Sequence, residues 1–450
     1  MPIKNQSYTV RIDGLNADGH GIGRIDGFTM FIPGALPGEL VRVLAVKLKK
    51  TYGFGKLLEI VEPADVRIEP SCEVFGKCGG CSLQHMSYTA QLEYKTTKVA
   101  EVLKRIGGAD CPVLDTIGMD EPFRYRNKAQ FPVGVASDGG IDIGFFAPRS
   151  HRIVPIIDCA LQSPINQKIL TIVENFMLKN KIAAYNEERH TGLIRHVVAR
   201  VGFVTGEIMV CVVINGENLP RSAELVQELR QIENITSIVL NINTNRTNVI
   251  MGNRVETLYG QEYITDYIGD IKFRISPKSF FQVNTPQTEA LYKAAQEFAQ
   301  LSPSDIVIDA YCGIGSIALF IADKVKKVWG IEIVPEAIAD ARVNAELNGI
   351  DNVEFICGSS EGELAWLAAR VRPDVIFLDP PRKGCDRRVL SAAAQSGARR
   401  IVYISCDPAT LARDVKLLAE GGYLAEKVQP VDMFGHTTHV ESVCLLSREG

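Results

Sequence analysis

The chain has 450 residues, a formal net charge of −4 at pH 7, 46% hydrophobic residues and 23% charged residues. This length predicts two or three domains, because single cores rarely grow past about 250 to 300 residues, and the composition excludes extensive disorder. No apolar run approaches the roughly 18 residues that span a bilayer, and the amino terminus has no apolar signal core. We therefore expect a cytoplasmic protein with no membrane partner. The negative charge also argues against nonspecific coating of nucleic acid, so any RNA affinity has to be local.

Residues 8 to 60 alternate short β-rich runs with turns that contain Gly and Pro, such as DGHGIG and PGALPGE. This pattern predicts a small closed barrel. The segment between Pro63 and Pro70 reads as a linker, so we place the first domain at residues 1–63. Lysines gather near the end of the barrel, although solvated surface charge explains them equally well. They are Lys47, Lys49, Lys50 and Lys56.

Three cysteines follow the linker as C-x5-C-x2-C, namely Cys72, Cys78 and Cys81. Cysteines in a chain without a secretory signal are expected to be reduced, so metal ligation or catalysis is considered before disulfides. Cys159 is a plausible fourth ligand, with Cys111 as a competitor. Four thiolates can bind either a [4Fe-4S] cluster or zinc, and the spacing leaves the metal open.

A helix is predicted over residues 88–106, ended by two glycines. Residues 124 to 265 mix strand-like and helix-like segments, which indicates an α+β unit, and we take residues 64–265 as a central domain. Further on, apolar strands alternate with helices. Such alternation is typical of an α/β fold with a parallel sheet covered on both faces, which we place at residues 266–450.

Glycines and carboxylates follow successive strands of this α/β unit. Gly313 and Gly315 lie in a turn between a buried strand and a helix, Glu332 ends the next strand, and Asp379 ends a further one. Ligands in such folds bind at the carboxyl ends of the strands, and a carboxylate about 20 residues after the turn can accept hydrogen bonds from ribose hydroxyls. Each feature alone is ambiguous. Together they favour a methyltransferase over a dinucleotide enzyme, whose G-x-G-x-x-G turn would need a third glycine.

Cys406 directly follows the strand RRIVYIS, and Glu441 lies at the start of the last predicted strand. A cysteine paired with a proton acceptor is what covalent catalysis at C5 of uracil requires. Cys312 is a rival better explained by packing, and spacing alone does not dismiss Cys385. The H-x-x-H pair, His436 and His439, lacks a suitable third ligand, so hydrogen bonding is favoured over zinc.

Five ordered motifs carry a resemblance that runs over essentially the whole chain: SPKSFFQVN (276–284), DAYCGIGSIAL (309–319), DPPRKG (379–384), SCDPATLARD (405–414) and HVE (439–441). The sequence resembles the uracil-C5 RNA methyltransferases, specifically the branch that acts on 23S ribosomal RNA. The resemblance implies a class I (Rossmann-like) methyltransferase domain, with Cys406 rather than Cys385 as nucleophile and Glu441 as base. It also implies that four residues contact S-adenosylmethionine, namely Gln282, Tyr311, Glu332 and Asp379.

The same resemblance extends to the amino-terminal half. The barrel looks like a TRAM domain, an OB-like RNA-binding module, in which Lys47 to Lys50, Tyr52 and Phe54 would bind RNA. The cysteines Cys72, Cys78, Cys81 and Cys159 are implied to hold a [4Fe-4S] cluster in an iron-sulfur central domain. A monomer acting on 23S rRNA is expected. The chain departs from the family pattern in DMFGH (432–436), where Gly435 replaces a usual proline and puts the rigidity of the loop in doubt.

Two other functions compete with this interpretation. A tRNA uracil-C5 methyltransferase shares the catalytic motifs but usually lacks the TRAM domain and the cysteine cluster, so residues 1–81 argue against it. A noncatalytic RNA-binding iron-sulfur protein could use the same scaffold. The presence of Cys406, Glu441 and Gln282 argues against that second alternative.

Overall fold

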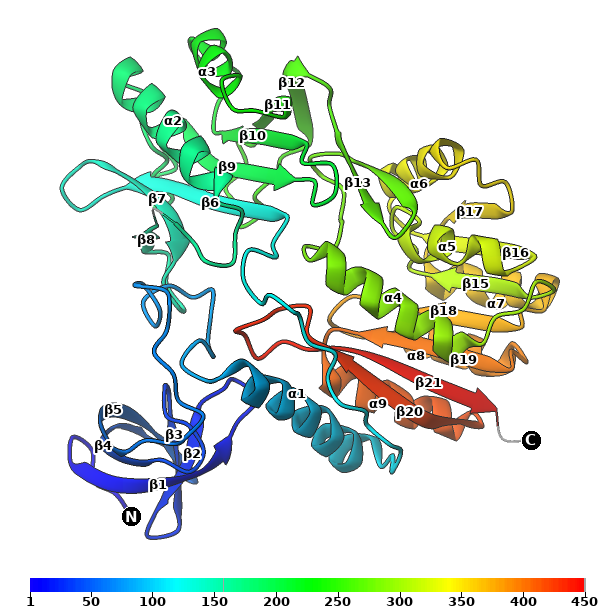
Figure 1. Cartoon of the computed structure of the whole chain (residues 1–450), viewed down its shortest axis with the longest axis horizontal. Coiled ribbons are helices and arrows are strands. Elements are labelled where there is room, and N and C mark those ends of the chain that lie inside the picture. The colour runs from blue at the N-terminus through cyan, green and yellow to red at the C-terminus, as the bar shows by residue number, and fades with distance from the viewer. Residues whose placement is uncertain (157, 449–450) are drawn as a thin grey trace.

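The computed structural model describes residues 1–156 and 158–448. Its amino-terminal unit is the predicted barrel, which closes in the strand order β1-β2-β3-β5-β4 (Figure 1). Apolar side chains of alternate positions fill its interior, among them Val10, Met30 and Val43. The strands are β1 (Ser7–Leu15), β2 (Gly21–Ile25), β3 (Phe28–Ile32), β4 (Leu40–Leu48) and β5 (Tyr52–Glu62).

Helix α1 (Tyr88–Val102) continues into a π-helical turn, Leu103–Gly107, and ends at Gly108, whose φ of 63° is left-handed. The predicted helix is therefore confirmed. Its apolar residues Val99 and Leu103 belong to the core of the carboxyl-terminal unit. The domain boundary at residue 265 remains a prediction. Helix α1 precedes the central sheet in the chain, but it packs in the core of the carboxyl-terminal unit.

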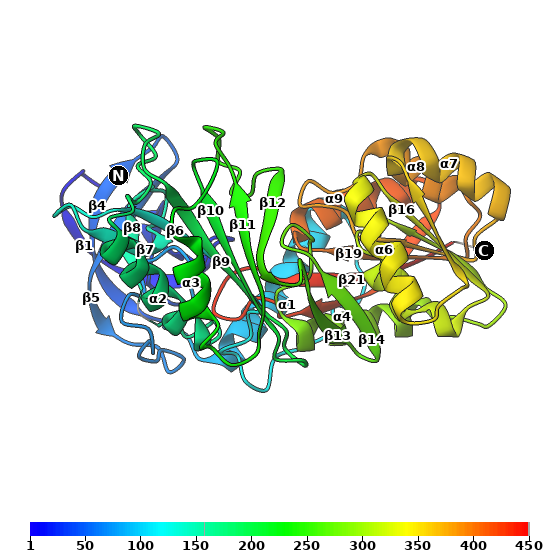
Figure 2. The same cartoon turned by 90° about the horizontal axis from the view of Figure 1, so that it is seen from above.

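The central unit is a seven-stranded sheet in the order β12-β11-β10-β9-β6-β7-β8, with the predicted α+β character. Helices α2 (Ile165–Asn180) and α3 (Ser222–Leu229) cover one face. Figure 2 shows both helices in front of this sheet. Residues of the opposite face, such as Val198 and Met209, join the core of the carboxyl-terminal unit. The strands are β6 (Lys128–Val135), β7 (Ile141–Phe146), β8 (Ile153–Pro155), β9 (Ile194–Val201), β10 (Ile208–Ile214), β11 (Ile235–Ile242) and β12 (Arg254–Gly260).

The carboxyl-terminal unit opens with a hairpin, β13 (Ile264–Ile268) and β14 (Ile271–Ile275), and with helix α4 (Thr285–Ala299). Its sheet has the order β17-β16-β15-β18-β19-β21-β20. The first five strands are parallel, and β21 runs antiparallel between β19 and β20. The strands are β15 (Ile306–Ala310), β16 (Lys327–Glu332), β17 (Val353–Cys357), β18 (Val375–Leu378), β19 (Arg400–Ser405), β20 (Tyr423–Val431) and β21 (Glu441–Arg448).

Helices lie on both faces of this sheet, as the alternating pattern predicted. The helices α4, α5 and α6 share one core with the hairpin, and α7, α8 and α9 share the other with α1. Their bounds are α5 (Ser316–Phe320), α6 (Pro335–Leu347), α7 (Ser360–Val371), α8 (Arg387–Gln395) and α9 (Pro408–Glu420).

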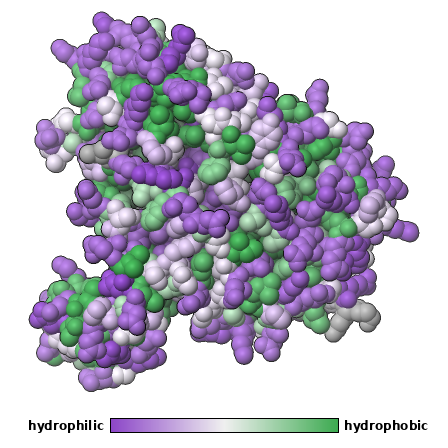
Figure 3. All heavy atoms as spheres, viewed as in Figure 1, coloured by the Kyte–Doolittle hydropathy of each residue, from purple (hydrophilic) through white to green (hydrophobic). Residues whose placement is uncertain are grey.

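Hydrophilic side chains predominate on the face shown in Figure 3, where the barrel forms a lobe at the lower left. Within the described part of the chain, no helix combines the length and the apolar character needed to cross a membrane.

Candidate active site

The residues singled out from the sequence converge at one edge of the carboxyl-terminal sheet. Tyr311, Asp379 and Cys406 follow β15, β18 and β19, and Glu332 ends β16. These strands are parallel, so their carboxyl ends share an edge. Glu441 joins them because β21 is antiparallel to β19 and pairs Ser442 with Ser405, which brings the start of β21 to the end of β19.

The turn after β15 is built for a close approach of backbone to ligand. The carboxylate of Glu332 accepts hydrogen bonds from the N–H groups of Gly313, at 3.2 Å, and Val334, at 2.9 Å. Gly315 has a φ of 83°, and a Cβ atom there would lie 2.9 Å from the Phe355 ring. Glycine is therefore required on both conformational and steric grounds.

Tyr311 also has a left-handed backbone, with a φ of 73°. This conformation is uncommon for a bulky side chain, and such strain clusters at functional sites. The hydrogen bond from its N–H to the Ile331 carbonyl, 2.9 Å long, fixes the turn against β16. The spacing of residues gave no reason to select Tyr311, because a backbone angle is not visible in the sequence.

Carboxylates are concentrated beneath this turn. Burial raises the pKa of Asp379 to about 7. Asp309, which spacing arguments did not single out, accepts a hydrogen bond from the Ala318 N–H at 3.0 Å. Burial, followed by the charges of Asp379 and Glu332, raises the pKa of Asp309 well above its ordinary value. A positively charged ligand would stabilise the ionised form of these carboxyl groups, so this edge of the sheet suits such a ligand.

Cys406 and Glu441 lie in a common electrostatic environment with Asp379 and Arg382. Burial, the charge of Glu441 and the charge of Asp379 raise the pKa of Cys406 to about 11, and Arg382 opposes this rise. Burial and then Asp379 raise the pKa of Glu441 to about 8, again opposed by Arg382. Glu441 is 4% exposed. A buried carboxyl group with a pKa near neutrality, beside a thiol, is suited to proton transfer.

The rival cysteines have different surroundings. Cys312 is buried in the core beneath the turn, which agrees with the packing role expected for it. Cys385 is buried in the opposite core, and its N–H donates to Asp414 at 2.8 Å. Burial raises the pKa of the Cys385 thiol to about 12. Cys406 is the only one of these three cysteines that is not buried.

Gln282 lies in the segment between β14 and α4. The side-chain amide of Asn127, from the central unit, donates to the Gln282 carbonyl at 2.8 Å, and the Asn127 N–H donates to the Val283 carbonyl at 2.8 Å. The next residue, Asn284, caps α4 by accepting from the Gln287 N–H. Two units of the chain therefore fix the backbone of Gln282, which no local pattern could reveal.

His436 is a hydrogen-bonding residue, as expected. Its ring nitrogen Nδ1 lies 3.3 Å from the Gln91 amide nitrogen, and its ring stacks on Phe123 with centroids 4.3 Å apart.

Four of the six cysteines in the amino-terminal half, Cys72, Cys78, Cys81 and Cys159, gather in one neighbourhood. Burial raises the pKa of Cys81 to about 12, and the thiols of Cys159, Cys78 and Cys72 add to that rise. Cys111 instead lies with Cys444 in the carboxyl-terminal unit. However, residues 1–156 and 158–448 contain no group of three or more His, Cys, Asp or Glu side chains placed to hold a metal ion. The four thiols lie near one another, but they are not placed as metal ligands. The structure therefore does not show an iron-sulfur domain.

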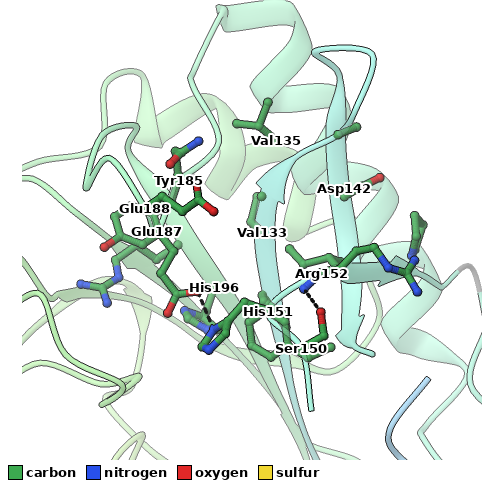
Figure 4. A pocket seen from close by; sticks show the side chains of 18 of the residues that line it. Val133, Val135, Asp142, Ser150, His151, Arg152, Tyr185, Glu187, Glu188 and His196 are labelled. Carbon is green, nitrogen blue, oxygen red and sulfur yellow. Dashed lines mark hydrogen bonds and ion pairs between the residues drawn. The ribbon is translucent and has the colours of Figure 1, made fainter. Parts of the chain in front are cut away.

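The central unit has a groove of about 1010 Å³ between β6 to β8 and the segment around Tyr185 (Figure 4). His151 Nδ1 lies 2.9 Å from a carboxylate oxygen of Glu187 across it. Four carboxylates line the groove against two arginines, because burial lowers the pKa of His196 to about 4 and keeps that ring neutral. This excess of negative charge argues against a phosphate-binding role for the groove. The charged residues are Asp138, Asp142, Arg152, Glu187, Glu188 and Arg195.

The topology, the glycine turn and the carboxylates at the strand ends define a class I, S-adenosylmethionine-dependent methyltransferase. A family model described as tRNA (Uracil-5-)-methyltransferase matches residues 87–449, and a TRAM domain model matches residues 4–58. The chain therefore belongs to the family of RNA uracil-5 methyltransferases, with an amino-terminal TRAM domain.

Similar proteins agree with this assignment. An uncharacterized RNA methyltransferase of Halalkalibacterium halodurans is 52% identical over 446 residues, which cover 98% of this chain and 97% of that protein. One from Clostridium tetani is 47% identical over 453 residues, covering 100% and 98%. The crystal structure of Pyrococcus abyssi tRNA (uracil-54, C5)-methyltransferase in complex with S-adenosyl-L-homocysteine has a TM-score of 0.80 and 29% identity, and the match covers 97% of this chain and 99% of that one.

The last match corrects one expectation. Residues 1–81 were taken to argue against a tRNA substrate, because tRNA uracil-C5 methyltransferases usually lack this region. A tRNA-modifying enzyme nevertheless matches 97% of the chain. The amino-terminal region therefore does not discriminate between ribosomal and transfer RNA.

Proposed function

We propose that the protein transfers a methyl group from S-adenosylmethionine to C5 of a uracil in 23S rRNA, with Cys406 as nucleophile and Glu441 as base. The observation that carries this proposal is the convergence of Cys406, Glu441 and Asp379 at one sheet edge, where Glu441 and Asp379 raise the pKa of Cys406 and Asp379 raises the pKa of Glu441.

The chemistry needs both residues because C5 of uracil is a weak nucleophile. The Cys406 thiolate adds to C6, the C5=C6 π electrons move onto C5 and the neighbouring carbonyl, and C5 takes the methyl group. Glu441 then removes the C5 proton, the C5=C6 bond forms again, and the C6–S bond breaks to release the thiolate. S-adenosylmethionine, when bound, supplies the electrophilic methyl group on a positively charged sulfur.

Both residues carry raised pKa values, so the site has to promote their ionisation. Arg382 favours the charged form of each. A bound cation near Asp379 acts in the same direction, because opposite charge stabilises an anion. The Cys406 thiolate would therefore form more readily when S-adenosylmethionine is bound.

Four residues are proposed to hold S-adenosylmethionine. Glu332 would exchange its hydrogen bonds with backbone N–H groups for bonds from ribose hydroxyls. Asp379 would face the positively charged end of the ligand. Tyr311 follows β15 at this edge, and the backbone of Gln282 is fixed by Asn127, as expected for groups that set the position of a ligand.

The RNA target has two candidates. The resemblance to the branch that acts on 23S ribosomal RNA favours 23S rRNA, and the full-length match to a tRNA-modifying enzyme favours tRNA as the alternative. Either RNA could approach a cavity of about 310 Å³ beside Gln282, which Arg126, Lys128 and the exposed Phe280 line. Cations and an exposed aromatic ring suit a phosphate and an unstacked base.

The mechanism is tested with radiolabelled S-adenosylmethionine and with transcripts of 23S rRNA and tRNA. The native protein should label one of these RNAs at C5 of uracil, and Cys406→Ala should lose the label by at least about a thousandfold, because the addition step is then absent. Cys385→Ala serves as the matched control and should retain activity. Undiminished transfer by Cys406→Ala would exclude the covalent mechanism, and the labelled RNA identifies the substrate.

We also propose that Cys72, Cys78, Cys81 and Cys159 bind a [4Fe-4S] cluster with a structural role. Their shared neighbourhood supports this proposal. Protein purified without oxygen should be brown and contain iron and acid-labile sulfide, and Cys81→Ser should lose both. A colourless preparation with stoichiometric zinc would contradict this assignment.

A further inference from the structure

Helix α1 presents a polar stripe to the loop that precedes Glu441. Tyr88, Gln91, Lys95 and Lys98 are spaced by three, four and three residues. This spacing places their side chains on one face of an α-helix. The facing segment is loop 432–440, which links β20 to β21 and leads directly into Glu441.

Every residue of the stripe contacts this loop. Tyr88 Oη donates to Asp432 Oδ2 at 2.7 Å, and Lys95 Nζ pairs with the other oxygen of Asp432. Lys95 also donates to the Phe434 carbonyl at 3.2 Å. Further along, the Gln91 Oε1 accepts from the His436 N–H at 3.0 Å, and Lys98 Nζ donates to the Thr438 carbonyl at 2.8 Å.

The loop is also fixed from its other side. The N–H groups of Ser82 and Leu83 donate to the His436 carbonyl at 2.9 and 3.0 Å. Tyr125 Oη donates to the Gly435 carbonyl at 3.2 Å. A Cβ atom at Gly435 would lie 2.8 Å from the Met119 methyl carbon, so glycine permits the close packing found here. The glycine that put the rigidity of the loop in doubt is therefore part of a tightly held segment.

The buried ion pair of Lys95 and Asp432 makes the contact between α1 and loop 432–440 energetically important. Both side chains are completely buried. Removing one partner of a buried ion pair leaves an uncompensated charge, which is strongly destabilising, whereas the intact pair defines one arrangement of the groups around it. The loop conformation is thus coupled to α1, more than 300 residues earlier in the chain.

We propose that Tyr88, Gln91, Lys95 and Lys98 are positioning residues for the catalytic base, acting through loop 432–440 on Glu441. The inference rests on the proposed function, in which Glu441 removes the C5 proton. It adds that α1 sets where this carboxyl group stands. Disturbing the stripe should therefore impair proton removal more than the preceding addition and methyl transfer.

The order of the chemical steps supplies a selective test. When proton removal is slow, the methylated adduct between Cys406 and C6 persists, and RNA stays attached to protein in a denaturing gel. A 23S rRNA or tRNA transcript that the native enzyme methylates is incubated with labelled S-adenosylmethionine and each variant. Lys95→Met should accumulate the labelled adduct, as is also expected of Glu441→Gln, and should turn over at least about tenfold more slowly. Lys104→Met, at an exposed position beyond α1, is the matched control and should behave as native.

A second variant separates positioning from folding. Lys98→Met removes the bond to Thr438, together with a longer bond to the Ala17 carbonyl of the barrel, and leaves the pair of Lys95 and Asp432 intact. It should show the same adduct to a smaller degree, with S-adenosylmethionine binding by calorimetry unchanged. Adduct levels equal to native in both variants, or equal losses of adduct formation and turnover, would overturn the positioning role while leaving the proposed function intact. A native enzyme that methylates no uracil, or a Glu441→Gln variant that turns over normally, would overturn both.

Discussion

At the scale of single residues, the site contains buried acids whose ionised forms are unfavourable. Glu441 and Asp379 are acids that burial holds partly protonated, with pKa values of about 8 and about 7, and the charge of Asp379 adds to the rise at Glu441. A buried carboxyl group of this kind is costly for folding, because the unfolded chain ionises it freely. The cost is tolerated where the same group serves as a base near neutral pH.

This cost predicts how stability depends on pH. The folded pKa of Glu441 lies above its unfolded value, so the folded state binds more protons between about pH 4.5 and pH 8, and the free energy of unfolding falls as pH rises through this window. Glu441→Gln removes the penalty. It should be more stable than the native protein by on the order of 2 kcal/mol above about pH 8 and nearly equal to it near pH 4.

Thermal unfolding at several pH values measures this difference. Glu101→Gln, on the exposed side of α1, is a control that should not change the melting temperature at any pH. If Glu441→Gln and the native protein differ equally at both ends of the range, the effect does not arise from ionisation.

At the scale of elements, the cofactor turn between β15 and α5 depends on one glycine. Gly315 needs a left-handed backbone and also lies against the Phe355 ring. A side chain there would change the backbone that shapes the site, in addition to the strain of about 1–2 kcal/mol that a left-handed conformation imposes.

Gly315→Ala is therefore expected to raise the KM for S-adenosylmethionine by about tenfold or more, because a 1.4 kcal/mol loss of binding already gives tenfold. Gly349→Ala is the matched control, since Gly349 has a φ of 64° with nothing near its Cβ position. It should lose comparable stability and keep a native KM. A native KM in the Gly315 variant, measured by initial rates, would contradict the assigned role of the turn.

The elements also show what the sequence could and could not predict. The barrel, the α/β alternation and the strand ends that carry Cys406 and Asp379 follow from local patterns of apolar residues and turns. The positions of Gln282 and α1 do not follow from local patterns, because long-range packing decides them. Asn127 of the central unit fixes the backbone of Gln282, and α1 joins the carboxyl-terminal core. Tyr311 was inaccessible to spacing arguments because its importance lies in a backbone angle.

At the scale of the whole molecule, the barrel offers RNA a surface separate from the reaction site. Phe31, Tyr52 and Phe54 form a cluster on β3 and β5 with ring centroids 5.6 to 5.8 Å apart. Lys47, Lys49 and Lys50 lie beside it in sequence. Aromatic rings next to cations suit single-stranded RNA, whose bases stack while its phosphates pair with lysine.

Tyr52→Ala should weaken RNA binding by about tenfold, since stacking of one base contributes about 1–3 kcal/mol, and should leave kcat unchanged. Filter binding at several salt concentrations tests this expectation. Lys49→Ala should instead lower the dependence of affinity on salt, because it removes a phosphate contact. Equal RNA affinity of the Tyr52 variant and the native protein would show that the cluster is not used.

The place of β21 has a consequence for protein synthesis. This strand is the last one of the described chain, yet it lies inside the sheet between β19 and β20 and begins with Glu441. Until residues 441–448 have left the ribosome, β19 and β20 lack the partner that joins them, and Glu441 does not stand beside Cys406. A nascent chain without these residues therefore lacks both the strand between β19 and β20 and the proposed base.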